Sequence, residues 1–300
     1  QLLSLTQGTS CLFFSLAHRF ITFFFFAGPA SFAQTRLYLD ERLRFENTDR
    51  AAVYSMVFAF ELKGPASVSV SRLRHALQSV ISIHAVLRTQ VSFDEKQRLL
   101  HQTILQSTDF PFHMSTAGDD NRKLQNILND EAHTPHMFGV EQGCVFRCHI
   151  VRRTPSDAGD DDQLRATDII ILNFHHIAFD GASIDIFLRD LRLAYAGELT
   201  HTIPLNYIDY AVHERLLDMH DSTQFWRNQL LDYAYSPLAL PYDRTPDNVQ
   251  SRSGRGYQVT FTVDDGVLAH DITLFQFGLA VLYTFLFKLT AECDLCVATV

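Results

Sequence analysis

The segment at residues 168–181, DIIILNFHHIAFDG, constrains the fold more than any other part of the sequence. Its first seven residues form an apolar run, which is typical of a β-strand buried on both faces. The segment that follows, at residues 183–197, places apolar residues on one helical face and ends at Gly197. A buried strand, a polar loop and an amphipathic helix in succession predict a layered α/β domain.

From Ser31 onward, the rest of the chain also alternates between helix-like and strand-like apolar patterns. With 47% apolar and 20% charged residues among 300, the chain can bury a large core. Acidic, apolar-poor stretches at 117–123 and 154–167 predict solvated loops. The patterns predict helices at 31–45, 69–87, 123–133, 208–218 and 273–290, strands at 51–62, 257–263 and 295–300, a strand ending the segment 136–151, and a hairpin that turns near 94–96.

Charge and cysteine content narrow the classes of partner. A net charge of -9, with no lysine or arginine stripe, excludes the basic surface that nucleic acids require. Five unevenly placed cysteines do not form a disulfide framework, so we expect a reducing, cytoplasmic setting. Cys293 and Cys296 form a CxxC pair that Cys144 and Cys148 could complete as a zinc site. We favour the simpler interpretation that Cys144, Cys148 and Cys296 belong to strands and that the chain holds no metal.

The amino-terminal residues 1–30 form an apolar leader of a different character. Residues 11–30 are strongly apolar but are interrupted by His18 and Arg19, so the uninterrupted stretch is too short to span a bilayer comfortably. A signal segment cleaved near residues 27–30 is one interpretation. Mis-joined sequence is the other, and on either we expect no membrane partner.

The polar loop after the predicted buried strand carries the candidate chemistry. His175, His176, Asp180 and Gly181 lie between that strand and the next helix, and in open α/β sheets this edge usually binds ligands. A histidine there can take a proton from an amine or a hydroxyl group near neutral pH. Gly181 would permit a tight turn. Residue frequencies predict roughly 0.002 chance matches to HHxxxDG in such a chain.

The run HHIAFDG resembles the HHxxxDG motif of condensation domains of nonribosomal peptide synthetases. Tyr38 stands where the family usually has tryptophan, and Ile83 where it usually has arginine. Five more segments are similar to the family's motifs and occur in the family's order: SFAQTRLYL at 31–39, HAVLRTQVSF at 84–93, YIDYAVHER at 207–215, LPYDRTP at 240–246 and TLFQFGLAVLYTFLFKLTAECDLCVATV at 273–300.

The resemblance implies an α/β fold of two chloramphenicol-acetyltransferase-like lobes arranged in a V, with the histidine motif at their junction. Residues 31–200 would form the N-terminal lobe, and residues 201–300 a partial C-terminal lobe. We expect that lobe to be incomplete, because the later motifs for the floor loop and the latch are not in the sequence. A helix usual in the family is also missing between VTFTV and TLFQ.

The resemblance also implies an acyltransferase that forms amide bonds. The amine of an acceptor aminoacyl thioester would attack a donor acyl or peptidyl thioester, and each would arrive on the phosphopantetheine arm of a carrier domain. Carrier domains and the adenylation domains of the same synthetase are therefore the expected partners. No tightly bound cofactor is expected, since the phosphopantetheine belongs to the partners.

Roles carry over from the family residue by residue. His176 would act as the general base or position the attacking amine, and His175 would support the loop through hydrogen bonds. Asp180 would hold the motif together by pairing with an arginine, and Gly181 would leave room for the phosphopantetheine arm. Arg88 would be a structural ion-pair partner or a tunnel residue.

Two alternatives stay open. An epimerization domain carries the same histidine motif but inverts an α-carbon. A catalytically inactive remnant would only bind carrier domains or would stay unfolded. The sequence contains no GxGxxG, GxxxxGK[ST] or HExxH motif, so dinucleotide, P-loop and metalloprotease chemistry are not indicated.

Overall fold

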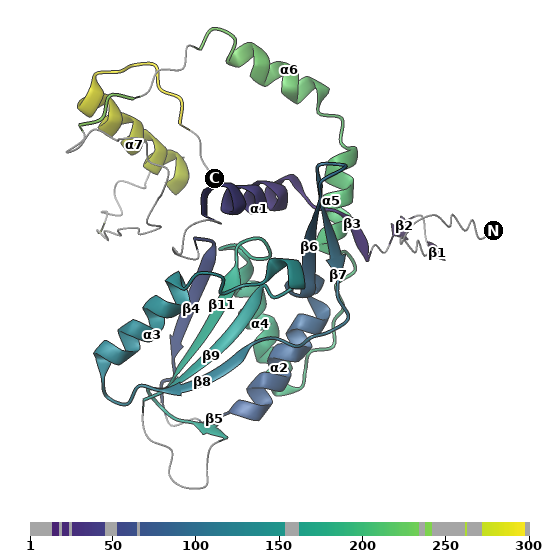
Figure 1. Cartoon of the computed structure of the whole chain (residues 1–300), viewed down its shortest axis with the longest axis vertical. Coiled ribbons are helices and arrows are strands. Elements are labelled where there is room, and N and C mark those ends of the chain that lie inside the picture. Colours follow the sequence, from purple (N-terminus) through teal and green to yellow (C-terminus); the bar gives the residue numbers. More distant parts are fainter. Residues whose placement is uncertain are drawn as a thin grey trace. The chain divides into compact units, whose positions relative to one another are not determined.

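A computed structural model describes residues 14–17, 20–23, 26–45, 53–64, 67–153, 162–233, 238–241, 262 and 272–297 (Figure 1). Described residues up to Leu217 belong to one compact unit. Helices α6 (His220–Gln229) and α7 (Leu274–Thr290) belong to a second unit. The predicted α/β class is confirmed in the first unit, which combines sheets and helices. No helix within the described ranges is long and apolar enough to cross a membrane.

The main sheet is built around the predicted buried strand. Its order is β4 (Ser55–Glu61), β11 (Ile169–His175), β9 (Phe146–Arg152) and β8 (Phe112–Thr116). Every residue of β11 is buried, which confirms the prediction for 168–174. Strands β4 and β9 run antiparallel to β11, and only β8 and β9 pair in parallel. The described sheet is thus mixed, and the buried apolar run of β11 does not by itself specify strand direction.

Helices cover both faces of this sheet (Figure 1). On one face, α2 (Val70–Ile83) and α4 (Ser183–Ala196) pack together over a core that includes Leu77, Phe174 and Phe187. On the other face, α3 (Asn121–His133) packs its apolar residues against Ile169 and Ile171. All three helices form where the apolar pattern of the sequence predicted a helix. Helix α4 ends at Gly197, whose φ of 80° is left-handed and favours glycine.

A second sheet has the order β3 (Ala27–Pro29), β7 (Leu99–Ile104) and β6 (Thr89–Asp94). The last residues of the apolar leader thus form a strand of this unit. The β6–β7 hairpin confirms the predicted turn, where Asp94 accepts hydrogen bonds from the backbone N–H groups of Lys96 and Gln97. Helix α1 (Phe32–Phe45) contributes Tyr38 to a core with residues of β6 and β7, and α5 (Tyr207–Leu216) packs against β3.

The remaining described elements of the first unit are short. They are the antiparallel pairs β1 (Phe14–Ala17) with β2 (Phe20–Phe23) and β5 (Val68–Ser69) with β10 (Gln163–Leu164), and the 3₁₀ turns η1 (Ala85–Arg88) and η2 (Val140–Gln142).

In the second unit, α7 confirms the predicted apolar helix. Thr273 and Gln276 form a capping box at its start. Within α7, Leu274, Phe275 and Phe285 are each more than half exposed. Helix α6 has no buried residue and was not predicted from the sequence. Most of the predicted strand at 257–263 and most of LPYDRTP at 240–246 lie outside the described residues. Residues 295–297 of the predicted strand at 295–300 are described and form no strand there.

Candidate functional site

The candidate site is the loop that joins the end of β11 to α4. His175 is the last residue of β11, and its N–H donates to the carbonyl oxygen of Val145 at 2.8 Å. The next N–H, that of His176, donates to the carbonyl oxygen of Tyr54 at 2.9 Å. Because these acceptors lie beside β9 and β4, the loop is fixed on both sides by the strands that flank β11.

His175 is held inside the loop, with only 3% of its side chain exposed. Its Nε2 lies 3.2 Å from a carboxylate oxygen of Glu41 on α1, and its Nδ1 accepts the N–H of Ile177 at 3.1 Å. These partners assign the hydrogen to Nε2. The rings of Tyr54 and Phe138 lie against the imidazole. Both ring nitrogens of His175 are therefore engaged by groups of the protein itself.

His176 has the opposite environment. It is exposed, and no hydrogen bond to its imidazole exists within the described part of the chain. Both ring nitrogens can therefore meet a ligand. Adjacent residues of one motif thus differ in availability because successive side chains at the end of a strand point to opposite sides.

Asp180 and Gly181 complete the loop before α4. The Asp180 carboxylate accepts from the Ser183 N–H at 2.9 Å and from its hydroxyl at 2.6 Å, so it binds the first turn of α4. No arginine of the described chain pairs with it, contrary to the expected ion pair. Gly181 is exposed and its backbone is not left-handed, so the expectation that the turn itself needs glycine was wrong. A Cβ at Gly181 would meet no atom within 4 Å.

Arg88 lies in η1, apart from the loop. Its guanidinium donates to the carbonyl oxygens of Leu105 and Ser82. Its Nε is buried without a hydrogen-bond partner, and desolvation by burial lowers the pKa of Arg88. The predicted ion pair is absent among the described residues, so Arg88 ties together backbone segments instead.

Sequence reasoning missed Glu41 and Tyr54, which frame the loop from distant parts of the chain. It also missed the neighbourhood of Tyr207, whose hydroxyl lies 2.9 Å from the Ser31 Oγ. Burial raises the pKa of Tyr207, and the negative charges of Glu214 and Asp180 raise it further. A carboxylate–tyrosine neighbourhood therefore extends from the loop toward α5, and only the motif similarity of residues 207–215 gave a hint of it.

The described residues contain no group of three or more histidine, cysteine, aspartate or glutamate side chains that could hold a metal ion. Cys148 is buried in the main core, whereas Cys293 and Cys296 are exposed. Desolvation raises the pKa of the Cys148 thiol to about 12, and the nearby Glu131 carboxylate adds to the effect. Such a thiol is inert as a nucleophile or a metal ligand.

The family model described as "Condensation domain" matches residues 27–300. The chain belongs to the condensation domain family. Condensation domains are acyltransferase-like enzymes that form amide bonds, and the expected family membership is thereby confirmed.

Similar proteins are large synthetases of secondary metabolism. The chain is 30% identical over 284 residues to Fusarin C synthetase of Gibberella fujikuroi, covering 90% of this chain and 7% of that protein. It is 29% identical over 297 residues to a linear gramicidin synthase of Brevibacillus parabrevis, covering 90% of this chain and 5% of that protein. This condensation-domain chain therefore spans less than a tenth of the length of these relatives.

Solved structures share the fold. The X-domain from teicoplanin biosynthesis has a TM-score of 0.67 and 25% identity, covering 89% of this condensation-domain chain and 58% of that chain. The starter condensation domain of rhizomide synthetase has a TM-score of 0.60 and 17% identity, covering 91% and 62%. At such low identity the second likeness shows the fold alone. Together they confirm the predicted chloramphenicol-acetyltransferase-like α/β class.

Proposed function

We propose that this chain catalyses amide formation between a donor acyl or peptidyl thioester and the amine of an acceptor aminoacyl thioester. Both substrates would be carried on phosphopantetheine arms of carrier domains, with adenylation domains of the same synthetase loading the amino acids. The observation that carries the proposal is the contrast between His175, fixed inside the loop, and His176, whose imidazole is exposed and unpaired within the described chain.

In this reaction the acceptor nitrogen attacks the thioester carbonyl carbon, a C–N bond forms, and the C–S bond breaks. The attacking amine must lose a proton, and the departing thiolate must gain one. An exposed imidazole can carry that proton, accepting it from the nitrogen and returning it to the sulfur. His176 can equally orient the amine through a hydrogen bond, and either role requires a ring nitrogen that no protein group occupies.

The space around Gly181 supports the same proposal. Gly181 is exposed, and a Cβ there would meet no atom within 4 Å apart from its chain neighbours, so the motif loop is open at this position. A slender thioester arm can approach the loop there. Among the described residues, the Asp180 carboxylate is hydrogen-bonded to Ser183, so we assign it a structural role in placing the start of α4.

The test combines the chain with two carrier domains, one bearing an N-acylated aminoacyl thioester and the other a pool of proteinogenic aminoacyl groups. Mass spectrometry of the acceptor carrier then detects a mass increase from the new amide. We expect product from the wild-type chain and from His213→Ala, a control on α5, but none from His176→Ala. Equal product from His176→Ala would refute the assigned role.

A second candidate function is a non-catalytic module that only binds other proteins. One structural relative favours it, since the teicoplanin X-domain is also recorded in a complex with the protein OxyB. Carrier binding by the folded wild-type chain without any amide product, across the whole acceptor pool, would support this candidate over the condensation reaction.

A further inference from the structure

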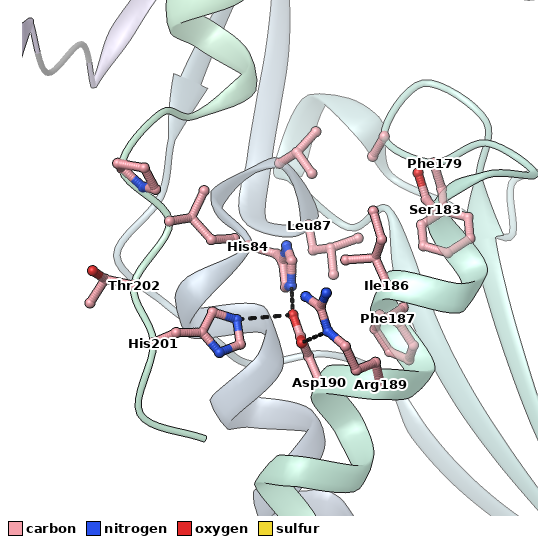
Figure 2. Close-up of a pocket in the computed structure, with 14 residues that line it drawn as sticks. His84, Leu87, Phe179, Ser183, Ile186, Phe187, Arg189, Asp190, His201 and Thr202 are labelled. Carbon is pink, nitrogen blue, oxygen red and sulfur yellow. Dashed lines mark hydrogen bonds and ion pairs between the residues drawn. The ribbon is translucent and has the colours of Figure 1, made fainter. Parts of the chain in front are cut away.

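A cavity of about 410 Å³ lies in the first unit, next to the motif loop (Figure 2). Its walls come from the end of α2 and η1, from the first half of α4, and from residues 201–204. The motif loop contributes Ala178 and Phe179, but His176 does not line the cavity. Apolar side chains make up much of the lining, among them Leu87, Ile186 and Phe187. The cavity can therefore take an apolar group of a small molecule.

A buried carboxylate forms the polar end of this cavity. The Asp190 side chain is 0% exposed. One of its oxygens accepts from the Arg189 Nε at 2.8 Å, and the other lies 2.8 Å from the His84 Nε2 and 3.4 Å from the His201 Nε2 (Figure 2). Burial alone would raise the pKa of Asp190, but the hydrogen bonds from Arg189 and His84 outweigh it and lower the pKa. Asp190 is therefore an ionised acceptor.

This arrangement leaves nitrogens of His84 and Arg189 unused. The His84 ring engages Asp190 through its Nε2, and its Nδ1 has no hydrogen-bond partner among the described residues. The two terminal nitrogens of Arg189 are donors, and neither has a hydrogen-bond partner among the described residues. In Figure 2 both groups lie on the side of Asp190 that faces Leu87. The cavity thus presents unpartnered nitrogens of His84 and Arg189 near an apolar wall.

We propose that this cavity binds a small amide with an apolar substituent, its carbonyl oxygen accepting from the Arg189 terminal nitrogens and its N–H donating to the His84 Nδ1. A carboxylate fits less well, since it has no hydrogen for His84 and would lie close to the negative charge of Asp190. An ester fits less well because it lacks the N–H. The apolar substituent packs against Leu87, Ile186 and Phe187.

Three probes that differ only in the head group test the proposal: N-methyl-4-methylpentanamide, methyl 4-methylpentanoate and 4-methylpentanoate. Their dissociation constants for the full chain are measured by saturation-transfer NMR, with no carrier domain present. We expect the amide to bind about tenfold more tightly than the ester, which is the scale of one net hydrogen bond. Equal affinities for the amide and the ester, or tighter binding of the carboxylate, would overturn the proposal.

Variants separate the polar and apolar parts of the site. Arg189→Met keeps the aliphatic stem and leaves Asp190 bound to both histidines, so we expect a folded chain that binds the amide at least tenfold more weakly. Ile186→Trp places a larger side chain at a half-exposed position and should block binding by filling the cavity. Arg192→Met is the matched control, one turn along α4 and outside the cavity. Amide binding by Arg189→Met at wild-type affinity would also overturn the proposal.

Discussion

The prediction that most directly tests the first unit concerns Glu131, a buried carboxylate on α3. Only 4% of its side chain is exposed. It accepts from the His149 Nδ1 at 2.8 Å and from the Asn173 Nδ2 at 3.2 Å, and it forms an ion pair with Arg147. Glu131→Gln keeps the shape but replaces one acceptor oxygen with a donor NH₂ group, and it leaves the charge of Arg147, whose side chain is only 14% exposed, without a counter-charge.

The expected loss follows from that uncompensated charge. Breaking one partner of a buried ion pair costs about 3–5 kcal/mol in the free energy of unfolding. For a unit of this size, each kcal/mol lowers Tm by about 2–4 °C, so Glu131→Gln should lower Tm by about 6–20 °C. Differential scanning calorimetry measures the shift. The control is Asp130→Asn, the exposed neighbour on the same helix, which should change the free energy of unfolding by less than about 0.5 kcal/mol.

The pH dependence gives a second readout of the same group. Burial alone would raise the pKa of Glu131, but hydrogen bonds from His149 and Asn173 and the charge of Arg147 outweigh it and lower the pKa. The unfolded chain therefore binds this proton more readily, so the stabilisation is present above the ordinary glutamate pKa and is lost as the pH falls through the folded value. The gap between wild type and Glu131→Gln should narrow below about pH 4. Similar Tm values for Glu131→Gln and Asp130→Asn at neutral pH would refute this reasoning.

Three further predictions concern the loop and the thiols. His175→Ala should lower the free energy of unfolding by about 2 kcal/mol, because it empties a buried, hydrogen-bonded position. His176→Ala should change the free energy of unfolding by less than about 0.5 kcal/mol. Equal losses for the two variants in urea titrations would contradict the assigned environments. Gly181→Ala should leave Tm unchanged, because its Cβ meets open space, and a clear loss would show that the loop needs glycine. At pH 8, 5,5′-dithiobis(2-nitrobenzoate) should modify Cys293 rapidly and Cys148 only after unfolding, as peptide mass spectrometry can check.

Local patterns in the sequence predicted the elements that have a long apolar run or a clear apolar period. Strand β11 follows from its continuous apolar run, helix α2 from its apolar period and helix α7 from its apolar length. Helix α6 escaped prediction because its only apolar residues, Phe225 and Trp226, are adjacent and so do not repeat at helical spacing. Strand direction also escaped, since residues buried on both faces look alike in parallel and antiparallel sheets.

The sequence predicted only those parts of the candidate site whose residues are close together along the chain. The motif located His175 and His176, but their different environments depend on Glu41 and Tyr54, which lie far earlier in the chain. Arg88 was expected to pair with a carboxylate, and its carbonyl partners depend on tertiary packing that no nearby residue indicates. Long-range pairing of this kind leaves no periodic trace in the sequence.

The partners that frame the motif loop also have an order along the chain. Among the described residues, the hydrogen bonds of His175 and His176 reach back to Glu41, Tyr54 and Val145 or forward to neighbouring residues of the loop. During synthesis on the ribosome, each of these distant partners is already made when the motif emerges. Chains generally fold from the amino-terminal side while translation continues. The loop can therefore form these hydrogen bonds during synthesis, as soon as α4 has been made.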